Sequence, residues 1–169
     1  MTRANTLIAV LLFSFAAPAL LAAPALAQAK TPASTASAAK TQPKGGEHQH
    51  RLILQVNTND AAAMNLALNN AANVDQYYSD RGEPVEIEII TFGPGLHMLR
   101  EDTSPVKDRI KSLAENRPSV QFKACGNTQE NMSKAESKKI PLVSQASVVP
   151  SGVVRILELQ EQGWSYVRP

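Results

Sequence analysis

The chain has 169 residues, with 17 Lys and Arg against 15 Asp and Glu and a formal net charge of +2. Residues 51–169 are closer still to neutrality, with 13 basic and 14 acidic side chains, so they lack the basic stripe typical of nucleic-acid-binding domains. A segment of this length is large enough for one domain with its own apolar core.

The N-terminus has the features of an export signal. Arg3 precedes a short apolar stretch at 7–21, and an Ala-Leu-Ala tripeptide at 25–27 precedes Gln28. This pattern predicts a signal peptide over 1–27 that is cleaved on export, most simply to a bacterial periplasm. The alternative is a membrane anchor, which the short length of the stretch and its prolines disfavour. We therefore expect no membrane attachment after cleavage.

Residues 28–50 have the composition of a disordered linker. Ala, Ser, Thr, Gln, Lys and Pro dominate, so the segment cannot bury enough apolar surface to offset the entropy of ordering. His48 and His50 at its end are too few ligands to predict a metal site. The folded domain is therefore expected to span 51–169.

Apolar spacing predicts strands that alternate with helices through the domain. The expected elements are a strand at 52–56, a helix at 61–80, a strand at 85–89, a helix starting near Pro105, a strand at 120–124, a polar helix at about 127–136, a strand at 146–149, a helix from 152 and a short strand at 164–167. This alternation predicts an α/β fold: a three-layer domain with a mostly parallel sheet of about five strands and helices on both faces.

Two of these strands have different patterns. Residues 52–56 form a nearly continuous apolar run, which predicts a central strand covered on both faces. At 85–89, apolar residues alternate with Glu86 and Glu88, so we expect one face of this strand to be partly exposed, near an edge of the sheet.

Cys125 is the only cysteine, and it ends a predicted strand where Gly126, Asn127 and Thr128 turn into a helix. The helix dipole and unpaired N–H groups at such a position favour thiolate over thiol. The alternative is an inert, buried small side chain. Because parallel strands end at one edge of a sheet, segments 57–60, 91–99, 125–128 and 150–152 should meet around this cysteine.

Four sequence segments carry a family resemblance. They are Phe-Gly-Pro-Gly-Leu at 92–96, Ala-Cys-Gly-Asn-Thr at 124–128, Val-Pro-Ser-Gly-Val at 149–153, and the ending Leu-Gln-Glu-Gln-Gly-Trp-Ser-Tyr-Val-Arg-Pro at 159–169. In this order and spacing they resemble the DsrE/DsrF-like family, which has the YchN-like fold. The resemblance implies a flavodoxin-like sheet, homotrimers or homohexamers, and a cysteine after the third strand that passes sulfane sulfur as a persulfide. Cys125 occupies that position.

Other residues at the same edge are weaker candidates. His97 could hold a thiolate or accept a proton. Asn59, Asp60 and Asn127 could bind an anion or a persulfide, although helix capping is the simpler role for Asp60. Gly126 and Ser151 lie in the adjoining turns, and the Pro-Ser-Gly context of Ser151 excludes a hydrolase nucleophile elbow.

Together these features predict a periplasmic sulfur carrier that needs no bound cofactor and exchanges sulfur with a donor and an acceptor. Two alternatives remain open. One is an oligomeric protein that binds a small anion or metabolite without catalysis. The other is a redox sensor in which Cys125 is oxidised.

Overall fold

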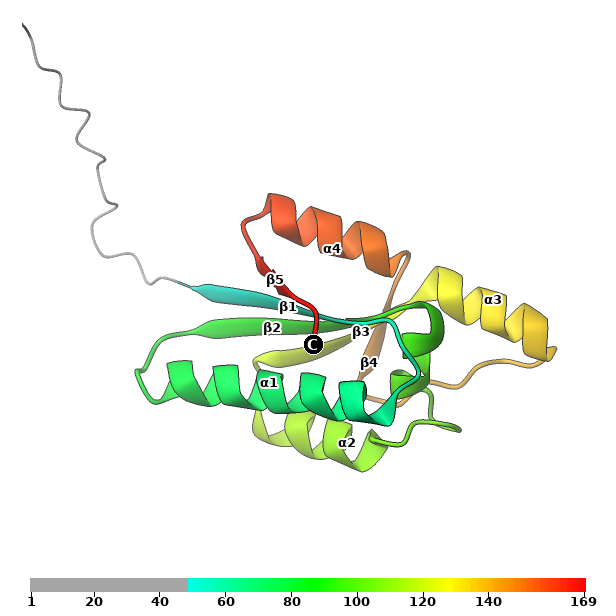
Figure 1. Ribbon diagram of the computed structural model, residues 1–169, viewed down its shortest axis with the longest axis horizontal. Coiled ribbons are helices and arrows are strands. Elements are labelled where there is room, and N and C mark those ends of the chain that lie inside the picture. Colours follow the sequence, from blue (N-terminus) through cyan, green and yellow to red (C-terminus); the bar gives the residue numbers. More distant parts are fainter. Residues whose placement is uncertain (1–48) are drawn as a thin grey trace, which may run out of the picture. The chain divides into compact units, whose positions relative to one another are not determined.

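A computed structural model describes residues 49–169 (Figure 1), so the predicted signal peptide and the linker up to residue 48 lie outside the described residues. The first strand begins at His50, one residue before the expected domain boundary. The elements are β1 (His50–Val56), α1 (Ala61–Ser79), β2 (Val85–Thr91), the 3₁₀ helix η1 (Gly93–Leu99), α2 (Lys107–Asn116), β3 (Val120–Cys125), α3 (Gly126–Glu136), β4 (Ala146–Val149), α4 (Gly152–Glu161) and β5 (Ser165–Val167).

The five strands form one parallel sheet in the order β4-β3-β2-β1-β5, which confirms the predicted α/β class. From β1 to β4 the chain steps across the sheet in one direction, and from β4 to β5 it returns to the far edge. Crossovers between parallel strands are right-handed, so a change of direction moves the connecting helix to the other face. Accordingly, α1 and α2 cover one face and α4 covers the other (Figure 1).

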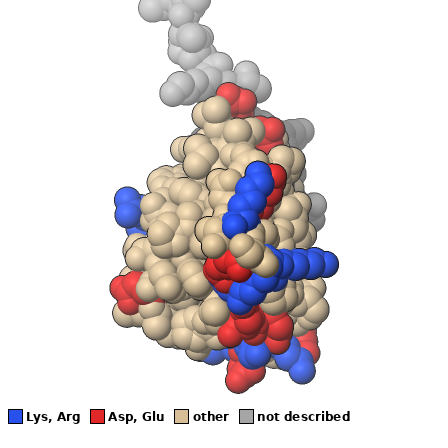
Figure 2. Space-filling model, turned by 90° about the vertical axis from the view of Figure 1, so that its right-hand side faces the viewer, with Lys and Arg blue, Asp and Glu red and all other residues tan. Residues whose placement is uncertain are grey.

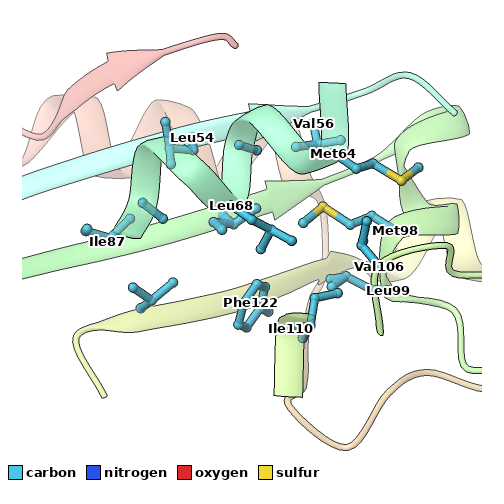
Figure 3. Close-up of a cluster of buried hydrophobic side chains, with 14 of the residues drawn as sticks. Leu54, Val56, Met64, Leu68, Ile87, Met98, Leu99, Val106, Ile110 and Phe122 are labelled. Carbon is cyan, nitrogen blue, oxygen red and sulfur yellow. The ribbon is translucent and has the colours of Figure 1, made fainter. Parts of the chain in front are cut away.

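The main core lies between the sheet and helices α1 and α2 (Figure 3). Alternate residues of the strands point into it, and the apolar stripes of both helices cover them. Burial of each large side chain of this kind contributes roughly 1.5–3 kcal/mol to folding. The fully buried members include Leu54, Ile87 and Phe122 from strands and Met64, Leu68 and Ile110 from helices.

The second core, under α4, is small and contains a buried charge. Ile53 and Ile90 of the sheet pack against Ile156 and Leu159 of α4. Beside them lies Glu88, which is only 3% exposed.

The expectation that β2 has a partly exposed face near an edge of the sheet was wrong. Strand β2 is the middle strand of the five, not one near an edge. The guanidinium of Arg155 on α4 donates to both carboxylate oxygens of Glu88, at 3.0 and 2.5 Å, and so replaces the water that the sequence pattern implied. The alternation of acidic and apolar residues in β2 therefore reflects an ion pair under a helix.

Helix α3 differs from the other helices because none of its residues is buried. It extends outward from the carboxyl edge of the sheet, away from the layers formed by α1, α2 and α4 (Figure 1). Its attachments are mostly polar: the amide of Gln129 donates to the carbonyl of Ile140 at 2.9 Å, and the N–H of Ile140 donates to Ser133 Oγ at 3.3 Å. Met132 is its one side chain packed against the main core. Among residues 49–169, no helix is both long enough and apolar enough to cross a membrane.

Candidate functional site around Cys125

Cys125 is the last residue of β3 and the N-cap of α3, as its position in the sequence predicts. It is 4% exposed. Strands β3 and β4 are in register at their ends, where Cys125 pairs with Val149. The chain leaves β4 there and enters α4 three residues later, so the first turns of α3 and α4 both begin beside the thiol.

Backbone N–H groups from two helix N-termini therefore lie near one sulfur, close enough to act on its pKa. The N–H groups of Asn127 and Thr128 come from the first turn of α3, and the N–H of Gly152 comes from the first residue of α4. The Asn127 N–H also donates to the carbonyl of Pro150 at 3.2 Å, which ties the two turns together. Such N–H groups have no partner within their own helix and stabilise negative charge.

The side chain of Thr128 adds a further donor. Its hydroxyl oxygen accepts a hydrogen bond from the N–H of Gly93 at 3.0 Å, which leaves the hydroxyl proton available to Cys125. Burial of the sulfur raises the pKa of Cys125, but hydrogen bonding from the Thr128 hydroxyl and from the three N–H groups lowers it by more. The net result is a pKa below that of an ordinary cysteine.

An open pocket of about 460 Å³ lies next to this thiol, between η1 and α3. Thr128 lines the pocket and also lowers the pKa of Cys125, so it connects the thiol with this space. None of the lining residues carries a carboxylate, an ammonium or a guanidinium group. They are Asn59, Gly93, Pro94, His97, Thr128, Asn131, Met132 and Ala135.

The wall of the pocket is held by a close backbone contact. A Cβ atom at Gly95 in η1 would lie 2.1 Å from the carbonyl oxygen of Val56 at the end of β1. Only glycine permits this approach, so the Gly-Pro-Gly sequence at 93–95 fixes η1 against the sheet.

Two of the predicted site residues, His97 and Asn59, line this pocket. The Nδ1 atom of His97 lies 2.8 Å from the hydroxyl of Thr103, a contact that orients the ring. The structure thus brings His97 and Asn59 together with Thr128, whereas Cys125 is not itself a lining residue.

Other predicted residues have local structural roles. Asp60 caps α1 by accepting from the N–H of Ala62 at 2.9 Å, the alternative that the sequence favoured. Ser151 caps α4 through the N–H of Val154 at 3.4 Å. Asn127 contributes to the site through its backbone N–H and not through its side chain.

Gly126 is packed closely beneath the site. A Cβ atom there would lie 3.2 Å from the side chain of Val148. Glycine at this position therefore lets α3 start close to β4.

Sequence reasoning missed Thr128 and Gly152 as partners of the thiol. Thr128 stands three residues after the N-cap, where a hydroxyl can bond back to the cap, so its spacing did carry a signal. For Gly152 the sequence gives no such signal, because its contact with Cys125 depends on the register of strands β3 and β4.

A metal site has no support in the described part of the chain, where no three His, Cys, Asp or Glu side chains cluster around a common point. His50, at the end of the predicted linker, lies 2.7 Å from a carboxylate oxygen of Glu83 and stacks on Tyr78. Its imidazole is therefore part of the folded domain.

Comparison with known proteins identifies the family. The model of the DsrE/DsrF-like family matches residues 50–169. The chain belongs to the DsrE/DsrF-like family. It is also similar to a solved structure described as that of a protein of unknown function, MTH1491, from Methanobacterium thermoautotrophicum. The two share 29% identity over 71% of this chain and 99% of the other, with a TM-score of 0.60. No curated protein matches significantly.

The surface at the carboxyl edge of the sheet is largely uncharged (Figure 2). Acidic and basic side chains lie interspersed mainly along one side and the lower end of this face, with a few at its other edges. Mixed charges give a weak net field, so we expect shape and hydrogen bonding, more than long-range attraction, to select what binds here.

Proposed function

We propose that this protein is an exported sulfur carrier that holds sulfane sulfur as a persulfide on Cys125. The DsrE/DsrF-like family is associated with sulfur relay, and this chain places its single cysteine beside two helix N-termini. That arrangement is the observation that carries the proposal, because it favours the nucleophilic thiolate.

In the loading step, the Cys125 thiolate attacks the terminal sulfur of a donor persulfide, R–S–SH. A new S–S bond forms to Cys125, the donor S–S bond breaks, and R–S⁻ leaves with the electron pair. In the unloading step, an acceptor thiolate attacks the outer sulfur and returns Cys125 to its thiolate form. Each step is an exchange at sulfur and needs no external oxidant or reductant.

The same hydrogen-bond donors favour both the loading step and the unloading step. The thiolate attacks in the first step and leaves in the second, and a lower pKa makes it a better leaving group. The hydroxyl of Thr128 and the N–H of Gly152 stabilise it at both points.

The pocket between η1 and α3 supports a second candidate function, the binding of a small uncharged metabolite without sulfur transfer. Its volume of about 460 Å³ and its mixture of amide, imidazole and apolar groups suit such a ligand.

Intact-mass analysis distinguishes these functions. After treatment with an organic persulfide, the wild-type protein should gain the mass of one sulfur atom and lose it on addition of excess thiol, while Cys125→Ser should gain nothing. No gain in the wild type would contradict the carrier function. A gain of one oxygen atom under peroxide alone would instead support a redox sensor.

Export is part of the same proposal and has its own test. Protein recovered from the periplasm of a producing cell should begin at Gln28 on N-terminal sequencing, because the Ala-Leu-Ala tripeptide precedes it. Recovery of chains that begin at Met1 would contradict cleavage.

A further inference from the structure

Arg100 is a buried arginine in a cluster of four charged side chains. It follows η1 directly and is 1% exposed. Its guanidinium donates to both oxygens of Asp102, at 2.9 and 2.8 Å, and to both oxygens of Glu136, at 2.5 and 2.9 Å. Lys138 joins the cluster at 3.0 Å from Asp102 and 3.3 Å from Glu136. The Arg100 guanidinium lowers the pKa of Glu136 to about 2.

This cluster joins the far ends of η1 and α3. Glu136 is the last residue of α3, and Arg100 follows the last residue of η1. At the near ends, the N–H of Gly93 in η1 donates to Thr128 in α3. The two helices are therefore tied at both ends, with the pocket between them.

Apolar packing holds α3 only through Met132, which is partly buried against the main core, and none of the helix's residues is fully buried. The position of α3 therefore depends mainly on polar attachments, and the paired Arg100–Glu136 bonds are the strongest of these because they are charged and bidentate. A shift of the C-terminal end of α3 would tilt the helix and move the hydroxyl of Thr128 relative to Cys125.

We propose that Arg100 is a positioning residue that, by holding Glu136, fixes α3 against η1 and keeps the Thr128 hydroxyl at Cys125. This inference rests on the reactive role of Cys125 proposed above. It makes a distant ion pair a determinant of the chemistry at the thiol.

The test is the pH dependence of Cys125 alkylation by iodoacetamide, measured on full-length protein. Arg100→Met should raise the midpoint by about one pH unit, which corresponds to about 1.4 kcal/mol of lost thiolate stabilisation. Methionine fills similar space beside Met132, and Lys138 still pairs with both carboxylates, so the variant should fold. Glu136→Gln, a milder change, should shift the midpoint in the same direction by less.

Two comparisons separate positioning from general destabilisation. Arg117→Met removes another arginine ion pair, between the residue that follows α2 and Asp75 of α1, and should leave the midpoint unchanged. The double variant Arg100→Met/Thr128→Val should have the same midpoint as Thr128→Val alone, because Arg100 acts through Thr128. Additive shifts, or an unchanged midpoint in both Arg100→Met and Glu136→Gln, would overturn the inference.

The readout uses no sulfur donor, so its outcome is independent of the carrier function. If the midpoint shifts as expected but organic persulfides load no sulfur, the carrier function fails and the positioning role stands. If sulfur loads normally and the midpoint does not shift, the positioning role alone fails.

Discussion

Gly152 and Cys125 are in direct contact, although they come from different βα units. A Cβ atom at position 152 would lie 3.4 Å from Cys125 Cβ and 3.0 Å from the Cδ1 atom of Phe92. The absence of a side chain therefore lets the first N–H of α4 approach the thiol. Gly152 does not adopt a left-handed conformation, so backbone conformation is not the reason for a glycine here. The reason is the close approach of α4 to Cys125 and Phe92.

We predict that Gly152→Ala raises the pKa of Cys125. The added methyl group meets the Phe92 ring, so the start of α4 must move away and its N–H donates less well to the thiolate. Overpacking of this kind costs about 1–3 kcal/mol in the free energy of unfolding. Alkylation against pH and urea denaturation measure the two effects. Gln160→Ala, at an exposed position of the same helix, is the control and should change neither.

A second prediction concerns the dependence of stability on pH. The pKa of Cys125 is lower in the folded protein than the free value of about 8.5, so the thiolate stabilises the fold at pH values above the free value. This contribution should disappear as the pH falls through the lowered, folded-state pKa. We expect the free energy of unfolding of the wild type, relative to that of Cys125→Ser, to increase as the pH rises from the folded-state pKa to the free value. A constant difference across that range would contradict a lowered pKa.

The two glutamates of β2 should differ sharply in their effect on stability. Glu88→Ala leaves Arg155 without its carboxylate under α4, and we expect a loss of about 2 kcal/mol, less than for a fully buried pair because Arg155 is partly exposed. Glu86 lies on the same face of the strand, but its side chain is 42% exposed, and the nitrogen–oxygen distance between Arg51 and Glu86 is 3.7 Å. Glu86→Ala should therefore cost less than about 1 kcal/mol. Urea denaturation of both variants measures the contrast.

We also predict a homo-oligomer, most simply a trimer or hexamer. The outer face of α4 exposes three large apolar residues, Val153, Val154 and Leu157, each more than half exposed. Such residues commonly mark surfaces that pack against another chain. Light scattering should give a mass above that of one chain, and Leu157→Glu should reduce it. Gln160→Glu introduces the same charge on the same helix and should have no effect, whereas a monomeric wild type would refute the prediction.

The sequence predicted the fold well because most of the signal is local. Apolar periodicity located the five strands, and the pattern at 52–56 identified β1 as an interior strand, which pairs with β2 and β5. The prediction that β2 lies near an edge was wrong because an acidic residue at every second position indicates a polar environment on one face. The pattern does not show whether that environment is water or an ion pair. Arg155, which covers Glu88, is 67 residues away in the chain.

The site was predictable only in part. Strand order brought four loops to one edge, and that topology placed Cys125 beside the turns that precede α3 and α4. The particular donors depend on register and on close packing at Gly152, which no spacing rule encodes. Arg100 was also missed, because its burial is made possible by Glu136 at the end of a helix later in the chain.

The weak packing of α3 has a consequence for access to the thiol. Because α3 has no buried residue, once the Arg100–Glu136 bonds break it should open locally at a lower free-energy cost than α1 or α2 and show faster amide hydrogen exchange. When α3 opens, Cys125 becomes accessible and at the same time loses the donors that stabilise its negative charge. If Cys125 carries sulfur as proposed, the closed form shields the loaded sulfur and the open form presents it for transfer.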